Sequence, residues 1–168
     1  MELGVKLGAD VPYCILRGTA LSEGIGEVLS SLPPIPDCYI LIAKPPISVS
    51  TKFVYKHLDV NSLTEHPDID GMIAAMKEGS LKGITERMEN VLETVTIPEY
   101  PVIQEIKVCM NENGAENSLM SGSGPTVFGI FKIKEDAEKA RERIREKELA
   151  GQVYIVKPFN QNNNYNYK

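Results

Sequence analysis

The segment from Leu119 to Phe131 constrains this sequence most, because a loop rich in glycine and serine leads there directly into an apolar run. The loop spans residues 121–125 (SGSGP), and the β-branched and aromatic residues at 126–131 predict a buried strand. Glycine allows a positive φ and a close approach of an anion to main-chain N–H groups, and serine hydroxyls add donors. Two interpretations follow: a phosphate-binding loop at the end of a core strand, or an ordinary tight turn.

The composition limits the class of protein. The 168 residues are 42% hydrophobic, which suffices for one sizeable core and part of another. The net charge is −5 and the basic residues are scattered, so we expect no nucleic-acid partner. No apolar run approaches the roughly 20 residues of a membrane span, and no signal peptide begins the sequence, so we expect a soluble cytoplasmic protein without a membrane partner.

Cysteine and histidine spacing argues against a disulfide framework and against a metal site. Cys14, Cys38 and Cys109 are far apart, odd in number and set among apolar residues, which predicts buried thiols in a reducing compartment. His57 and His66 have no partner at the spacing of metal ligands. We therefore expect no metal ligands in this sequence.

The first 37 residues predict a small unit ahead of the main domain. Residues 1–7 have the pattern of the last turns of a helix, residues 13–16 that of a strand, and residues 19–27 that of a strand, a turn and a second strand. The prolines within 33–36 then interrupt regular structure. The sequence thus divides into 1–37, a domain over 38–159, and a polar, asparagine-rich tail over 160–168 that we expect to be disordered.

Asp10 is the candidate acid–base residue of the first unit. It stands among small residues, just before Val11 and Pro12. An aspartate in this setting more often caps a helix or closes a turn. The alternative is a carboxylate presented at a loop for proton transfer, and the residues alone leave both open.

From residue 38 onward the apolar pattern predicts one α+β domain. Strands are expected at 39–43, on both sides of the glycine–serine loop and at 152–156, and helices at 52–58, 72–76, 81–92, 101–113 and 135–149. The order of strand, helices, two strands, helix and strand satisfies a ferredoxin-like split βαβ plait with extra helices after its first strand. Such a sheet is mostly antiparallel and has helices on one face.

Two features of this domain do not fit a simple hydrophobic core. Asn90 is polar among the apolar neighbours of the predicted helix 81–92, and is either a hydrogen-bonded core amide or a group that reaches a ligand. The side chains at 53–55 cannot all face inward on one short helix. One aromatic ring of that helix should therefore point into a cleft or into solvent.

Ordered stretches of the sequence resemble the GHMP small-molecule kinases. Residues 7–12 (LGADVP), followed by GTA at 18–20 and EGIGE at 23–27, resemble the central segment of the branch that phosphorylates a cytidine-diphospho-methylerythritol. Residues 120–129 (MSGSGPTVFG) resemble the third signature of the family in the form that this branch carries. The segment 49–51 with Tyr55, and residues 90–93 (NVLE), match in order and spacing, so that the resemblance covers residues 1–158.

This resemblance implies transfer of phosphate from ATP, with Mg²⁺, to the 2-hydroxyl of that substrate in non-mevalonate isoprenoid biosynthesis. At matching positions, Asp10 is the catalytic aspartate that orients and deprotonates the attacking hydroxyl, Tyr55 stacks on the cytosine ring, and Thr51 lies in the substrate-contacting segment. The loop that closes over the phosphate and acceptor region comprises Ser121, Gly122, Ser123 and Gly124. Asp10 and this loop are expected to border one cavity.

The sequence departs from the family pattern at its beginning. It lacks the lysine-bearing strand and the Pro-x-x-x-Gly-Leu-Gly-Ser-Ser loop that grips the ATP phosphates. The resemblance therefore implies a C-terminal portion with little activity of its own: residues 1–37 are a remnant of the N-terminal catalytic domain, and an N-terminal half is missing. Two rival functions are another GHMP kinase, for homoserine, mevalonate or a sugar, and a non-catalytic plait-fold module for binding or regulation.

Overall fold

A computed structural model describes residues 6–8, 10–60 and 66–160. Its helices are α2 (Val11–Leu16), α3 (Thr51–His57), α4 (Ile69–Lys77), α5 (Leu81–Thr85), α6 (Glu93–Glu99), α7 (Val102–Glu112) and α8 (Lys134–Glu146). Its strands are β1 (Ala20–Glu23), β2 (Val28–Ser31), β3 (Tyr39–Lys44), β4 (Asn117–Met120), β5 (Val127–Phe131) and β6 (Gln152–Val156). Most of the predicted helix end at 1–7 and of the predicted tail at 160–168 lies outside the described residues.

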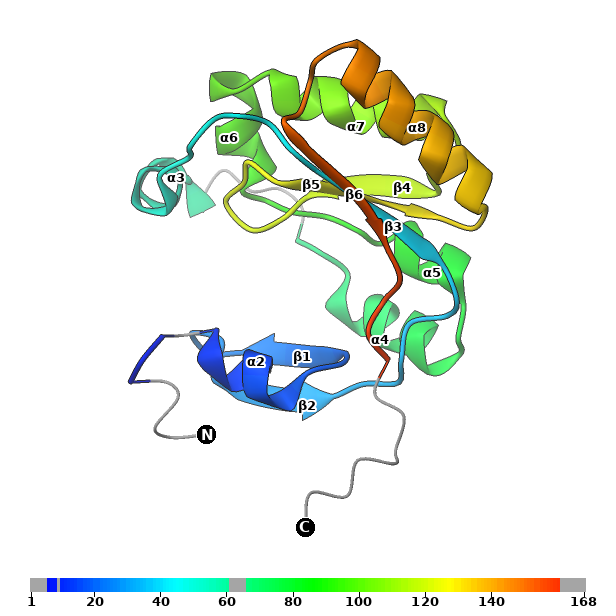
Figure 1. The fold of residues 1–168 in the computed structure, drawn as a ribbon. Coiled ribbons are helices and arrows are strands. Elements are labelled where there is room, and N and C mark those ends of the chain that lie inside the picture. Colours follow the sequence, from blue (N-terminus) through cyan, green and yellow to red (C-terminus); the bar gives the residue numbers. More distant parts are fainter. Residues whose placement is uncertain (1–5, 9, 61–65, 161–168) are drawn as a thin grey trace.

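The main sheet has four antiparallel strands in the order β4-β5-β3-β6. Along the sequence, the inner strand β3 comes first and is followed by helices α3 to α7. The β4–β5 hairpin, helix α8 and the edge strand β6 come after them. This is the strand order of a split βαβ plait, so the predicted ferredoxin-like fold with extra helices is confirmed. Helices α7 and α8 lie together over one face of the sheet (Figure 1).

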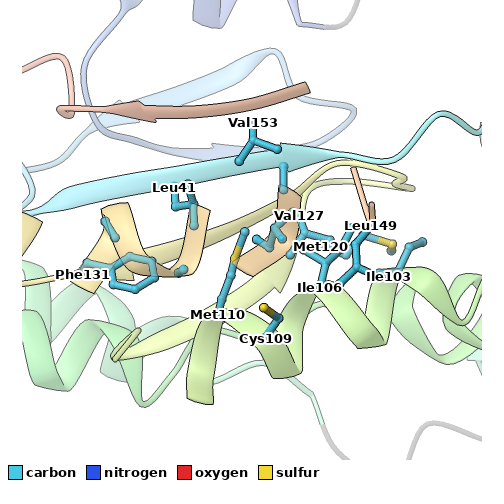
Figure 2. Close-up of a cluster of buried hydrophobic side chains, with 14 of the residues drawn as sticks. Leu41, Ile103, Ile106, Cys109, Met110, Met120, Val127, Phe131, Leu149 and Val153 are labelled. Carbon is cyan, nitrogen blue, oxygen red and sulfur yellow. The ribbon is translucent and has the colours of Figure 1, made fainter. Parts of the chain in front are cut away.

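The principal core lies between that face and the two helices. Alternate residues of the central strands point into it, since successive strand side chains face opposite sides. Figure 2 shows Leu41 and Phe131 on the sheet opposite Ile106 and Met110 on α7, and all four side chains have no exposed surface. Helix α8 contributes Ala137, Ala140 and Ile144 to this core. The two alanine side chains are short, which lets the helix approach the sheet closely.

The opposite face of the sheet is covered only in part. Ile130 of β5 packs there with Cys38 and Leu81, and α4 packs against α5 beside them. The β1–β2 hairpin and α2 form a separate small unit on this side of the sheet, away from α7 and α8 (Figure 1). Within the described ranges, no helix has the length and apolar character needed to cross a bilayer.

Two sequence-based expectations about helices and strands are wrong. Residues 13–16 belong to helix α2 and not to a strand, because Pro12 in the first turn already has the φ of a helix. The single helix expected at 81–92 is interrupted: α5 ends at Thr85 and α6 begins at Glu93. The Asn90 side chain accepts a hydrogen bond from the Leu92 N–H at 3.0 Å, a local bond that competes with continued helix.

The expectation of three buried thiols holds for Cys38 and Cys109 and is wrong for Cys14, which is exposed. The helical conformation explains this error. In α2 the buried side chain is Pro12, and a residue two positions further along a helix points to a different face.

The cysteines should differ sharply in reactivity. Burial raises the pKa of the Cys38 thiol, the neighbouring Asp37 carboxylate raises it further and Lys157 lowers it; burial also raises the pKa of Cys109. Because the thiolate is the reactive form, brief treatment with iodoacetamide at pH 8 should alkylate Cys14 first. Peptide mass spectrometry measures the order, and urea should open the other two sites. Equal labelling of all three thiols in the native protein contradicts the structure.

Helix α7 offers a matched test of the core. Ile106 has no exposed surface, whereas Val108 on the same helix is 41% exposed. Truncating a fully buried isoleucine removes its transfer free energy and leaves a cavity, so Ile106→Ala should lower the free energy of unfolding by about 2–5 kcal/mol. Val108→Ala, the control, should change it by less than about 1 kcal/mol. Urea denaturation followed by circular dichroism gives both values, and similar losses for the two variants would show that α7 packs differently.

Candidate functional site

The glycine–serine loop joins β4 to β5 as a tight turn. The Ser121 N–H donates to the Thr126 carbonyl at 2.8 Å, and the Gly124 N–H donates to the Ser121 carbonyl at 3.0 Å. The φ angles of Gly122 and Gly124 are +57° and +86°, in the left-handed region that glycine adopts at least cost. A Cβ at Gly122 would meet no atom within 4 Å, so the space in front of that residue is open. The turn thus leaves room for a ligand. A tight turn and a phosphate-binding loop, the two interpretations of this segment, are therefore compatible.

The two glycines of the loop have different surroundings. A Cβ at Gly124 would lie 2.7 Å from the Met120 sulfur and 3.4 Å from the Thr96 methyl carbon. Side chains therefore pack directly against Gly124, while Gly122 faces open space. Of these two glycines, only Gly122 has room for a ligand in front of it.

Polar side chains from the segment before α6 and from α6 hold the loop on its protein side. The Asn90 amide donates to the Met120 and Gly122 carbonyls, each at 2.8 Å. The Thr96 hydroxyl donates to the Ser123 carbonyl at 3.3 Å. Of the two interpretations of Asn90, the hydrogen-bonded amide is therefore the one observed, and its partners belong to the candidate loop.

Helix α3 brings the predicted substrate residues to the same place. Ser50 caps the helix by accepting a hydrogen bond from the Phe53 N–H, as its position in the sequence suggests. The Thr51 and Ser123 hydroxyls lie 2.9 Å apart and share a hydrogen bond. Tyr55 follows Thr51 by four residues, on the same side of the helix, and its side chain is 62% exposed. The aromatic residue expected to point outward is thus Tyr55.

Asp10 stands at the N-cap of α2, but its side chain makes no capping hydrogen bond and is exposed. It lines a cavity of about 960 Å³ between α2, the β1–β2 hairpin and the partly covered face of the sheet. The body of that cavity is apolar and includes Met76, Met88 and Phe128.

The structure does not bring Asp10 and the loop to this one cavity. Neither Thr51, nor Tyr55, nor any residue of 121–124 is part of its lining. The reason is topological: Asp10 belongs to the small unit below the sheet, whereas the loop projects from the β4–β5 end of the sheet (Figure 1). This cavity thus does not join Asp10 to the loop, and the expectation that the two border one cavity stays a prediction.

The described residues do not themselves form a magnesium site. Nowhere in 6–8, 10–60 and 66–160 do three His, Cys, Asp or Glu side chains converge so that they could hold a metal ion. Mg²⁺ that binds together with ATP usually takes one or two carboxylates and the phosphate oxygens, so such a cluster is not required for the ion that the resemblance implies.

Sequence reasoning missed two residues that support the loop. Thr96 is polar yet has no exposed surface, and Lys107 forms an ion pair with Glu93 in which both side chains are only 15% exposed. The available signal was spacing, because Asn90, Glu93 and Thr96 recur every three residues and so tend to share one side of a helical segment. Lys107 gave no such signal, since its role depends on a contact between two helices.

Known proteins resemble this chain in sequence. The family model described as "GHMP kinases C terminal" matches residues 72–149. The protein named 4-diphosphocytidyl-2-C-methyl-D-erythritol kinase from Lachnospira eligens is 57% identical over 159 residues, which are 95% of this chain and 55% of that protein. The protein of the same name from Lachnoclostridium phytofermentans is 53% identical over 163 residues, 97% of this chain and 56% of that protein. The chain thus spans about half the length of these curated relatives.

Solved structures agree with the sequence matches. A crystal structure of 4-(cytidine 5'-diphospho)-2C-methyl-D-erythritol kinase superimposes with a TM-score of 0.76 at 27% identity, covering 93% of this chain and 55% of that one. Homoserine kinase from Cytophaga hutchinsonii superimposes with a TM-score of 0.74 at 20% identity, covering 89% of this chain and 50% of that one, and this second likeness concerns the fold alone. These matches in sequence and fold agree with one another, and residues 72–149 match the C-terminal domain of the GHMP kinases, a family of small-molecule kinases.

Proposed function

We propose that this chain is the substrate-holding, C-terminal part of a cytoplasmic kinase that transfers the γ-phosphate of ATP to the 2-hydroxyl of 4-diphosphocytidyl-2-C-methyl-D-erythritol. The observation that carries the proposal is the 2.9 Å contact between the Thr51 and Ser123 hydroxyls. It joins the helix that bears Tyr55 to the glycine–serine loop. A nucleotide base and a phosphate group of one substrate can therefore be held by neighbouring elements of this domain.

Each element supplies one part of the recognition. The exposed ring of Tyr55 is free to stack on cytosine, which buries apolar surface on both partners. Thr51 sits one helical turn before Tyr55 and offers a hydroxyl to the substrate. The hydroxyls of Ser121 and Ser123 and the amides of Gly122 and Ser123 belong to the loop and are donors of the type that bind phosphate oxygens. The Gly124 amide instead donates within the turn.

Asp10 is the proposed base. As the 2-hydroxyl oxygen bonds to the γ-phosphorus of ATP, its proton passes to the Asp10 carboxylate, and the bond to the leaving ADP oxygen breaks. The exposed carboxylate without a capping hydrogen bond supports this role over helix capping. Catalysis then consists mainly of holding the hydroxyl in line with the phosphorus, with the base contributing about 10²–10⁴-fold.

The proposed active site requires more chain than these residues. Apolar side chains of the first unit lie in solvent: Leu7, Tyr13, Ile15, Ile25 and Val28 are between 44% and 83% exposed. Together with the apolar cavity beside Asp10, they form a surface that a folded domain normally covers. We therefore assign residues 1–37 to an incomplete N-terminal domain and residues 38–159 to the C-terminal domain. The half of the relatives' length that this chain does not span would cover the first unit and bring the loop that anchors ATP.

Binding of the cytidine moiety tests the substrate part of the proposal. Base–aromatic stacking contributes about 1–3 kcal/mol, so Tyr55→Ala should raise the Kd for CDP, measured by isothermal titration calorimetry, by about 5- to 150-fold. Tyr55→Phe keeps the ring and should bind nearly as the wild type does. Tyr154, on β6, is 57% exposed and serves as the matched control, because Tyr154→Ala removes an equally exposed ring elsewhere. Equal losses for Tyr55→Ala and Tyr154→Ala argue against a cytosine site on α3.

Turnover tests the catalytic part. With ATP, Mg²⁺ and 4-diphosphocytidyl-2-C-methyl-D-erythritol, the chain alone should produce little or no ADP in a coupled assay. Mixing it with the separately expressed N-terminal half of the Lachnospira eligens relative should restore ADP formation, and Asp10→Asn should then reduce the rate by about 10²–10⁴-fold. Turnover by the chain alone at the rate of the intact relative refutes the claim that further chain is needed. A restored rate with homoserine or mevalonate but not the cytidyl substrate identifies a different kinase.

A further inference from the structure

One amide side chain fixes the direction in which the loop presents its main chain. The Asn90 amide nitrogen donates to the carbonyls of Met120 and Gly122, and its oxygen accepts from the Leu92 N–H. Both donors and the acceptor of this side chain are therefore used within the protein. The two carbonyls that it binds lie on either side of Ser121, so Asn90 bridges the beginning and the middle of the loop.

Because the peptide bond is planar, these carbonyl contacts also fix the direction of the neighbouring N–H groups. In a trans peptide the C=O and the following N–H point in opposite directions. Because the Gly122 carbonyl points at Asn90, the Ser123 N–H points away from the protein side of the loop. The Ser121 carbonyl is likewise engaged by the Gly124 N–H, which directs the Gly122 N–H away from that bond. The Gly122 and Ser123 N–H groups thus point away from the contacts that hold the loop. They lie at or next to Gly122, in front of which the structure is open.

A largely buried ion pair anchors the last residue of β4, directly before the loop. Glu93 accepts a hydrogen bond from the Met120 N–H at 2.7 Å through one carboxylate oxygen. Its other oxygen binds the Lys107 ammonium group, and both side chains are 15% exposed. The Ser118 hydroxyl donates to the Lys107 carbonyl at 3.2 Å, so α7 is also tied to β4.

The charge of Lys107 matters because of what the loop is proposed to bind. Glu93 places a carboxylate directly behind the main chain of Met120, next to the loop. At low exposure, opposite charges a few ångströms apart interact strongly, and an unpaired carboxylate there would repel an incoming phosphate. Lys107 neutralises that carboxylate while leaving its hydrogen bond to the loop intact.

We propose that Asn90, Glu93 and Lys107 are positioning residues that hold the glycine–serine loop in its phosphate-binding form, an inference that rests on the function proposed above. Asn90 turns the Gly122–Ser123 peptide so that its N–H faces the ligand. Glu93 anchors the Met120 N–H, and Lys107 removes the electrostatic penalty of having a carboxylate at that place. None of the three needs to touch the substrate.

Hydrogen exchange in the free chain tests the role of Asn90 without any ligand. Asn90→Ala should speed the exchange of the hydrogen-bonded Ser121 and Gly124 amides, followed by NMR, at least about tenfold beyond any change in α7 and α8. Asn117 is the matched control, since its amide also donates to a main-chain carbonyl, that of Thr85, from the other end of β4. Asn117→Ala should leave the loop amides unchanged relative to the helices. If Asn90→Ala speeds exchange uniformly across the domain, its role is merely structural and the inference is wrong.

Binding of CDP tests the charge compensation. Lys107→Met should weaken CDP binding about tenfold, and adding Glu93→Gln should restore most of it, because the double variant has no unpaired carboxylate next to the loop. Lys132→Met, which breaks the more exposed ion pair with Glu116 at the other end of the β4–β5 hairpin, is the control and should bind CDP as the wild type does. Failure of the double variant to recover affinity overturns the charge argument.

The two experiments separate this inference from the function on which it rests. If the wild-type chain binds no CDP, the proposed substrate is wrong, whereas the exchange rates still decide whether Asn90 positions the loop. If CDP binds and depends on Tyr55 but not on Lys107 or Asn90, the proposed function stands and the positioning inference fails.

Discussion

The antiparallel pairing of β3 with β5 at the middle of the sheet is the interaction on which the rest of the structure depends. It runs from Tyr39 opposite Phe131 to Ala43 opposite Val127. Four inward side chains of this pair have no exposed surface and form the floor on which α7 and α8 pack: Leu41, Ala43, Val127 and Phe131. The glycine–serine loop ends where β5 begins, and the pairing of Met120 with Val127 closes it. The large apolar contact between β3 and β5 thus fixes the position of the small polar loop.

Sequence patterns were most informative where burial is periodic. The strand at 152–156 and the run after the loop were predicted as the structure has them, because alternating or continuous apolar residues leave few other ways to bury their side chains. Residues 13–16 failed because four apolar residues fit one turn of a helix as well as a strand, and Pro12 decided between them. In the break between α5 and α6, the Asn90 side chain accepts a hydrogen bond from the Leu92 N–H, a contact that no hydrophobic pattern records.

The residues of the candidate site also differ in whether the sequence indicates them. Thr51, Tyr55 and the loop were predicted from a resemblance in ordered motifs, and the hydroxyl contact between positions 51 and 123 is a property of the fold that no local pattern contains. Thr96 and Lys107 escaped notice because a buried threonine and a paired lysine look like ordinary helix residues until their partners on other elements are known. The proposed role of Asp10 rests on the resemblance together with a carboxylate that makes no capping hydrogen bond.

The two parts of the chain differ in how well they can hold a functional group in place. In the part from β3 to β6, the core is closed, and every buried side-chain nitrogen or oxygen among the described residues has a hydrogen-bond partner. The earlier part consists of a two-stranded hairpin and a helix of six residues, with apolar side chains left in solvent. A lone hairpin is marginally stable in water, so the position of Asp10 depends on whatever else packs against it. On the proposed function, recognition by Tyr55 and the loop needs only the closed core, whereas placing the proposed base against its hydroxyl needs a second, completed domain. Under that proposal, this distribution of buried surface favours substrate binding without turnover.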